Sequence, residues 1–89
     1  IVFFKIHPEV EDGDFNKAID LLTKLGDQVG IIEWDIRESL DTRKGKIIIE
    51  NSLFTNQESF ESFRLSSEHA QVGEFMRTIS DWWVADYVE

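Results

Sequence analysis

Residues 31–54, with the sequence IIEWDIRESLDTRKGKIIIENSLF, decide the fold because they predict two strands and the turn between them. In residues 31–40, charged side chains alternate with an apolar face made of Ile32, Trp34, Ile36 and Leu40. Residues 46–54 are the next predicted strand, centred on three consecutive isoleucines. The turn at residues 41–45 includes Gly45, which supplies backbone freedom. Two strands joined by so short a turn predict an antiparallel hairpin.

On the amino-terminal side, residues 2–7 predict another strand, with Val2, Phe4 and Ile6 on its apolar face. An acidic segment follows, in which Asp12 or Asp14 is expected to cap a helix. The apolar residues of this helix recur every three or four positions: Phe15, Ala18, Ile19, Leu22 and Leu25.

On the carboxyl-terminal side, Thr55 and Glu58 have the spacing of a capping box for a short helix. Ser66 and Ser67 are expected to interrupt this helix, and a second helical run follows with a buried stripe at Val72, Phe75, Met76 and Ile79. Residues 83–88 predict the last strand. The order β-α-β-β-α-β predicts a single α+β domain over residues 1–89, with a ferredoxin-like four-stranded antiparallel sheet and a broken second helix.

Composition excludes several classes of function. The formal net charge of −9 disfavours nucleic acid or an anionic membrane as a partner. The absence of cysteine removes disulfides and thiolate chemistry and fits a reducing, cytoplasmic compartment. No stretch has the length of a membrane span or the pattern of a signal peptide. Since only His7 and His69 offer imidazole ligands, neither a metal site nor a cofactor is expected.

The region from Phe54 onward carries a family resemblance. Phe54 is followed nine residues later by Phe63, then by the stretch Ser66-Ser67-Glu68-His69, and the chain closes with Trp83-Val84-Ala85-Asp86-Tyr87. In these features the chain resembles the stress-responsive A/B barrel family. The resemblance implies a homodimeric α/β barrel in which two sheets pack face to face. Phe3, Trp83, Ala85 and Tyr87 are the residues expected to cover the bare sheet face against the partner.

The same family includes an aromatic polyketide cyclase that uses a Tyr and a His on the broken helix. The resemblance places His69 at the catalytic His and Phe63 at the Tyr, although Phe63 has no hydroxyl group. Ser66 stands where the family often has another His, and Ile48 stands where the cyclase has a pocket His.

His69 is the main candidate for chemistry, because an imidazole titrates near neutral pH. It could serve as a general acid or base in a pocket, or it could be a helix-start residue satisfied by Ser66 or Glu68. If the family register is right, Glu50 shares a face with Ile48 toward the helices, where it could orient His69. Because Ile47 and Ile49 make the opposite face equally apolar, Glu50 could instead be solvated or lie at the dimer interface. Trp34 and Phe63 could line an aromatic pocket or belong to the core.

A second polar set consists of Lys5, His7, Glu33, Asp35 and Arg37. These residues could bind a small anion or form cross-strand ion pairs at a dimer interface. Two functions therefore remain open. The first is a homodimeric binding protein for a small apolar or aromatic ligand, and the alternative is a cofactor-free enzyme, cyclase-like or monooxygenase-like, with His69 as general acid or base.

Overall fold

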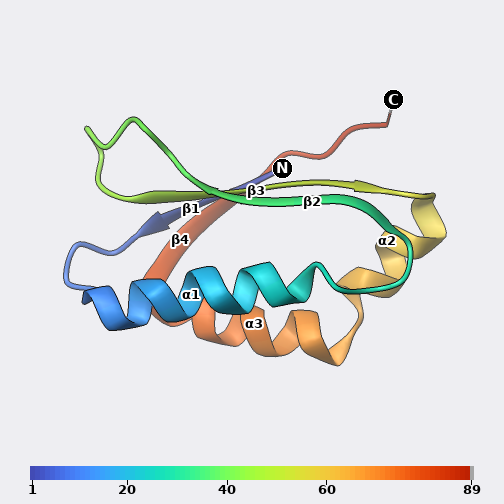
Figure 1. Cartoon of the computed structure of the whole chain (residues 1–89), viewed down its shortest axis with the longest axis horizontal. Coiled ribbons are helices and arrows are strands. Elements are labelled where there is room, and N and C mark those ends of the chain that lie inside the picture. Colours follow the sequence, from blue (N-terminus) through green and yellow to red (C-terminus); the bar gives the residue numbers. More distant parts are fainter. Residues whose placement is uncertain (89) are drawn as a thin grey trace.

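The computed structural model describes residues 1–88, which form four strands and three helices. In chain order these are β1 (Val2–Ile6), α1 (Asp12–Leu25), β2 (Ile31–Glu38), β3 (Ile47–Phe54), α2 (Gln57–Arg64), α3 (Ser67–Ile79) and β4 (Ser80–Val84). This order confirms the predicted ferredoxin-like α+β plan with a broken second helix (Figure 1). Among these helices, none combines the length and the apolar character that crossing a membrane requires.

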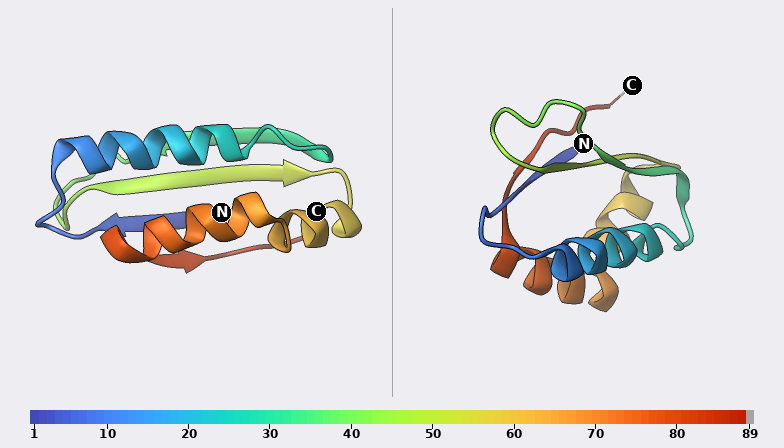
Figure 2. Two further views of the ribbon diagram at one scale, coloured as in Figure 1. Left: turned by 90° about the horizontal axis from the view of Figure 1, so that it is seen from below. Right: turned by 60° about the vertical axis from the view of Figure 1, so that its left-hand side comes forward.

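The strands form one antiparallel sheet in the order β2-β3-β1-β4. All the described helices lie against one face of this sheet, and the other face carries none (Figures 1 and 2). Because successive side chains of a strand point to opposite faces, each strand has an inner row toward the helices and an outer row. The inner rows and the helices enclose the core.

The β2–β3 hairpin forms as predicted, and Gly45 in its turn has a φ of 98°. β2, however, contains a bulge, because its register against β3 shifts by one residue between Ile31 and Glu33. Ile31 therefore packs against the core while Ile32 is 59% exposed. Leu40 lies beyond the end of β2 and is fully exposed. The prediction that Ile32 and Leu40 share the inner face with Trp34 is wrong.

α1 buries Phe15, Ala18, Leu22 and Leu25, as its apolar spacing predicts. The predicted cap is wrong, because the helix begins at Asp12 and Glu11 occupies the cap position without a side-chain hydrogen bond. The two aspartates lie in the first turn, where negative charge interacts favourably with the helix dipole.

The predicted capping box at Thr55 is also wrong. Asn56 caps α2, since its side-chain oxygen accepts a hydrogen bond from the Ser59 N–H at 2.8 Å. The Thr55 hydroxyl donates instead to the Gly30 carbonyl at 3.1 Å. The predicted break between the helices is confirmed: the Ser66 hydroxyl accepts from the His69 N–H at 3.1 Å and donates to the Phe63 carbonyl at 2.8 Å. One side chain thus closes α2 and caps α3.

β4 begins at Ser80, directly after α3, and ends at Val84, so the predicted strand at residues 83–88 is placed too late. Ser80 has extended backbone angles and pairs with Ile6 of β1, which draws the chain into the sheet as soon as α3 ends. Beyond β4, the Ala85 N–H still donates to the Ile1 carbonyl at 2.8 Å.

Candidate functional site

A cavity of about 200 Å³ lies between the inner face of the sheet and the helices. Its wall is mostly apolar, and every strand except β2 contributes at least two residues to it, while β2 contributes Trp34. The main apolar side chains on the wall are Phe4, Leu22, Leu25, Trp34, Phe54, Phe60, Phe63, Val72 and Met76. Of the five predicted pocket residues, Trp34, Glu50, Phe63 and His69 line this cavity.

The aromatic part of the wall is held by ring-to-ring contacts. The Phe63 ring lies 5.1 Å from the Phe54 ring and 5.4 Å from the Trp34 ring, in tilted or edge-on orientations that aromatic pairs prefer. The Trp34 indole N–H donates to the Leu22 carbonyl at 2.9 Å. An added Cβ at Gly26 would overlap the Trp34 ring, so this glycine permits the close approach of α1's end to β2.

Glu50 is the one buried charged residue among residues 1–88, and its side chain faces the helices from β3, which is one of the two placements that the sequence left open. It is only 6% exposed, and its neighbours across the strands are Val2 on β1 and Ile36 on β2. Burial raises the pKa of the Glu50 carboxyl group, the Ser52 hydroxyl and the Ile1 ammonium group oppose this effect, and the Asp86 carboxylate adds to it. The proton is therefore held more tightly at Glu50 than at an exposed glutamate.

His69 lies in the first turn of α3, half-buried, with its ring edge-on to Phe63 at a centroid distance of 5.0 Å. Burial lowers the pKa of the imidazole, and the positive charge of Arg64 lowers it further. The neutral imidazole is thus favoured near pH 7. Among residues 1–88, no side-chain hydrogen bond joins His69 to Glu50, although both line the same cavity.

The cavity opens beside β4. Its lining includes Trp82, Val84 and Asp86, which are exposed, with 39% of Trp82 accessible. Sequence reasoning missed these residues because it placed the last strand too late. Their signal was the alternation that continues from Ser80, in which the even positions face the helices. Ser52 and Arg64 also line the cavity and were not among the predicted pocket residues.

The structure places the remaining candidates elsewhere. Ile48 is fully buried and does not line the cavity. The second polar set is divided, because β3 lies between β1, which carries Lys5, and β2, which carries Glu33, Asp35 and Arg37. His7 contacts Asp81 at 3.3 Å, while Arg37 contacts Asp35 at 3.4 Å. Within residues 1–88, no group of three or more His, Asp or Glu side chains is placed to hold a metal ion.

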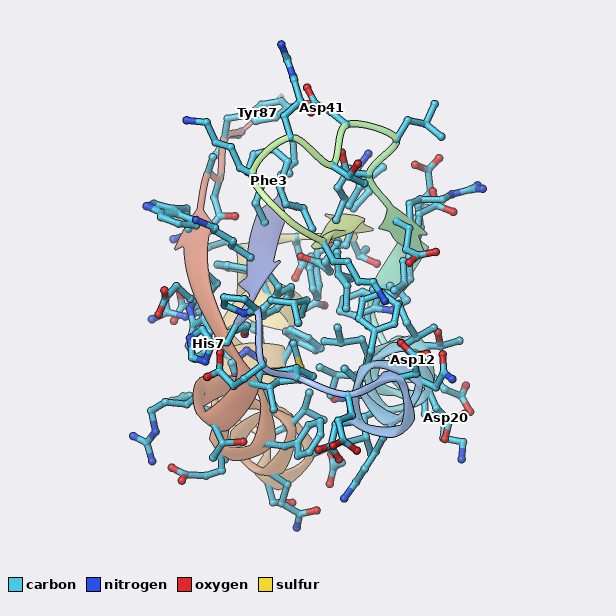
Figure 3. All side chains as sticks on the ribbon, turned by 90° about the vertical axis from the view of Figure 1, so that its left-hand side faces the viewer. Phe3, His7, Asp12, Asp20, Asp41 and Tyr87 are labelled. Atoms are coloured by element: carbon cyan, nitrogen blue, oxygen red, sulfur yellow. The ribbon has the colours of Figure 1, made fainter. Side chains whose placement is uncertain are left out.

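The four residues predicted for a dimer interface share the outer side of the sheet. Phe3 pairs with Trp83 across β1 and β4, and these side chains are 43% and 59% exposed. Ala85 and Tyr87 follow β4 and are exposed as well. Figure 3 shows Phe3 and Tyr87 on the side away from the helices.

Comparison with known structures supports the fold. A dimeric protein of unknown function with a ferredoxin-like fold from Bacteroides fragilis superposes with a TM-score of 0.75 at 15% identity, covering 97% of this chain and 89% of that chain. A conserved protein of unknown function from Bacteroides thetaiotaomicron, described as a possible oxidoreductase, gives a TM-score of 0.71 at 21% identity, with 92% and 85% covered. No curated protein matches the chain.

The family resemblance found in the sequence is confirmed over its full length. The family model described as the stress-responsive A/B barrel domain, or Dabb, matches residues 1–89. The topology, the broken second helix and the single-sided helix layer are consistent with that match. The chain therefore belongs to the stress-responsive A/B barrel domain family.

Proposed function

We propose that this protein is a homodimer whose subunits each bind a small apolar or aromatic ligand in the cavity beside His69. The observation that carries the proposal is the cavity of about 200 Å³, whose wall is mostly apolar but includes four ionisable side chains, those of Glu50, Arg64, His69 and Asp86. An apolar cavity of about 150 Å³ is enough to hold benzene, whereas pockets for drug-sized ligands exceed about 300 Å³. The ligand is therefore a single ring with few substituents, or an aliphatic molecule of that size.

The bare sheet face supports the dimer. Phe3 and Trp83 lie side by side on it and are both exposed, and the half-buried Ile49 of β3 pairs with Phe3 in the next strand. Contiguous exposed apolar side chains of this kind are unfavourable in water and mark association surfaces. The Bacteroides fragilis protein of the same fold is dimeric. A second copy of the chain packed on this face would bury these apolar side chains.

Replacing Trp83 with glutamate tests the dimer by analytical ultracentrifugation. The expected result is a dimer for the unmodified protein and a dissociation constant raised by more than about tenfold in Trp83→Glu, because a charge is buried against an apolar partner. Leu65→Glu is the control, since Leu65 is also an exposed apolar residue, 83% accessible against 59% for Trp83, but lies between α2 and α3. A monomer at micromolar concentration for the unmodified protein would falsify the dimer.

Toluene is a suitable probe for the cavity. Amide chemical-shift changes on titration are expected in residues that line the cavity, with Phe63 and Val72 among them. Gly73 also lines the cavity, and a Cβ added there meets no atom within 4 Å. Gly73→Leu should therefore fill the space and abolish toluene binding, while Gly73→Ala should retain it. Equal binding by both variants would place toluene elsewhere.

Cofactor-free acid–base catalysis is a second candidate, favoured by the neutral imidazole of His69 on the cavity wall. His69 could take a proton from the carbon next to a ligand carbonyl group and return it from solvent. Binding takes precedence because Phe63, the aromatic neighbour of His69, has no proton to donate. The test is deuterium incorporation into the methyl group of acetophenone in D₂O. An unmodified protein no faster than buffer, or as fast as His69→Gln, excludes the catalytic role.

A further inference from the structure

Glu50 is a carboxyl group without the partners that a buried charge requires. Its Oε1 atom has no hydrogen-bond partner among residues 1–88. The permanently cationic side chain on the cavity wall in that part of the chain is Arg64, which is engaged with Glu61 at 3.5 Å. A carboxylate moved out of water without a cation or donors is strongly disfavoured, and such a group retains its proton instead.

The other groups around the cavity act on the Glu50 pKa in both directions, and burial, which raises it, is the largest influence. Asp86, which follows β4, also raises the pKa, while the Ser52 hydroxyl and the Ile1 ammonium group, which lies 3.5 Å from Asp86, lower it. His69 on α3 is favoured in its neutral form and so supplies little positive charge. A protonated carboxyl group differs from a carboxylate in one decisive respect, because it can donate a hydrogen bond.

We propose that the ligand of the cavity is an uncharged aromatic molecule with a carbonyl oxygen, and that this oxygen accepts a hydrogen bond from the Glu50 carboxyl group. The inference rests on the proposed binding function and adds the chemical class of the ligand. The apolar wall favours the aromatic ring of such a ligand, and the buried hydrogen-bond donor favours its carbonyl oxygen. Anionic ligands such as carboxylates are excluded, because they would lose hydration in an apolar cavity next to Asp86.

The experiment compares acetophenone with ethylbenzene, which has the same carbon skeleton without the carbonyl oxygen. Dissociation constants for both probes are measured by titration calorimetry on the unmodified protein, Glu50→Gln and Glu50→Leu. The preference for acetophenone over ethylbenzene should fall about threefold to tenfold in Glu50→Leu, as expected for loss of one neutral hydrogen bond. Glu50→Gln should keep most of the preference, because its amide still donates. Comparing ratios cancels the different hydration of the two probes.

The outcomes separate this inference from the binding proposal. If neither probe binds the unmodified protein, the proposed function is wrong. If both bind and their ratio is the same in Glu50→Leu, the cavity binds ligands but the role of Glu50 is overturned. Benzoate binding as tightly as acetophenone would also overturn it.

An infrared measurement on the unmodified protein keeps the test independent of whether Glu50→Leu folds. A hydrogen bond to the oxygen should shift the carbonyl stretch of bound acetophenone to lower frequency than in hexane. The shift should persist in His69→Phe and in Ser52→Ala, each of which removes another donor on the wall. A bound carbonyl group with its hexane frequency, or a shift lost in either variant, would show that Glu50 does not donate to the ligand.

Discussion

Replacing Gly73 with leucine is expected to stabilise the protein, although glycine-to-leucine changes in packed structures usually cause clashes. Gly73 lies within α3, which spans Ser67–Ile79, and it lines the cavity. A Cβ added to Gly73 meets no atom within 4 Å. The leucine side chain can therefore extend into a space of about 200 Å³ that already exists, without displacing the wall.

The gain has two parts. Removing a glycine from a helix interior contributes about 0.5–1 kcal/mol, because glycine loses more backbone entropy on folding than other residues. Burial of the new side chain adds about 0.8 kcal/mol for each carbon atom removed from water. Gly73 is only partly buried, so we expect roughly half of the leucine side-chain carbons to be removed from water. This burial adds about 1.5 kcal/mol to the free energy of unfolding. We expect Gly73→Ala to raise the free energy of unfolding by about 1 kcal/mol and Gly73→Leu by about 2–2.5 kcal/mol.

Urea unfolding monitored by tryptophan fluorescence measures this difference. All variants should be compared at one protein concentration, because the stability of a dimer depends on concentration. Each kcal/mol also corresponds to about 4–8 °C in Tm for a domain of this size. A Gly73→Leu variant no more stable than Gly73→Ala would refute the reasoning, since it would show that the cavity wall closes in solution and leaves no room for a side chain.

Further variants test the buried acid, the helix cap and the turns. Because the folded state holds the Glu50 proton more tightly than the unfolded chain, the contribution of Glu50 to the free energy of unfolding falls as pH rises above about 4.3. The stability gain of Glu50→Gln over the unmodified protein should therefore grow between pH 4 and pH 7.5 in urea titrations. A gain that is constant with pH would contradict the raised pKa. Ser66→Ala should lower stability by about 1 kcal/mol in thermal melts, because it removes the α3 cap. Gly45→Ala should lower the free energy of unfolding by about 1 kcal/mol, because Gly45 has a positive φ. Gly30→Ala should lower it further, because Gly30 also has a positive φ and an added Cβ would lie 2.6 Å from Ser59. Equal melting temperatures for these two variants would argue against the close contact.

Local patterns in the sequence predicted most of the architecture. The stripe of α1, the hairpin and the break at Ser66 depend on spacing and on the chemistry of neighbouring residues, which are visible without a structure. These features are decided over a few residues, so tertiary contacts had little opportunity to override them. The direction of Glu50 stayed open in the sequence, because Ile47 and Ile49 make the opposite face of the strand equally apolar, and the structure places Glu50 toward the helices.

The errors occurred where neighbouring residues can satisfy the same requirement, where a residue is inserted into a regular pattern, and where a strand partner is distant in sequence. Thr55 and Asn56 can both cap α2, and the hydrogen bond of Thr55 to Gly30 leaves the cap to Asn56. The bulge that exposes Ile32 inserts one residue into a regular alternation, and period-two reasoning cannot locate such an insertion. β4 begins earlier than predicted because Ser80 pairs with β1, a partner distant in sequence.

The sequence by itself determined the family, the fold class and the buried faces of β1, α1 and α3, because these follow from periodicity and motif spacing. Only the tertiary structure decided that Glu50 and His69 share one cavity, that Ile48 lies outside it, and that Lys5 is separated from Glu33 by a whole strand. The physical reason is that a cavity is the volume left when α2 and α3 settle on the sheet. That volume depends on contacts between distant segments and on how well their side chains fill the space.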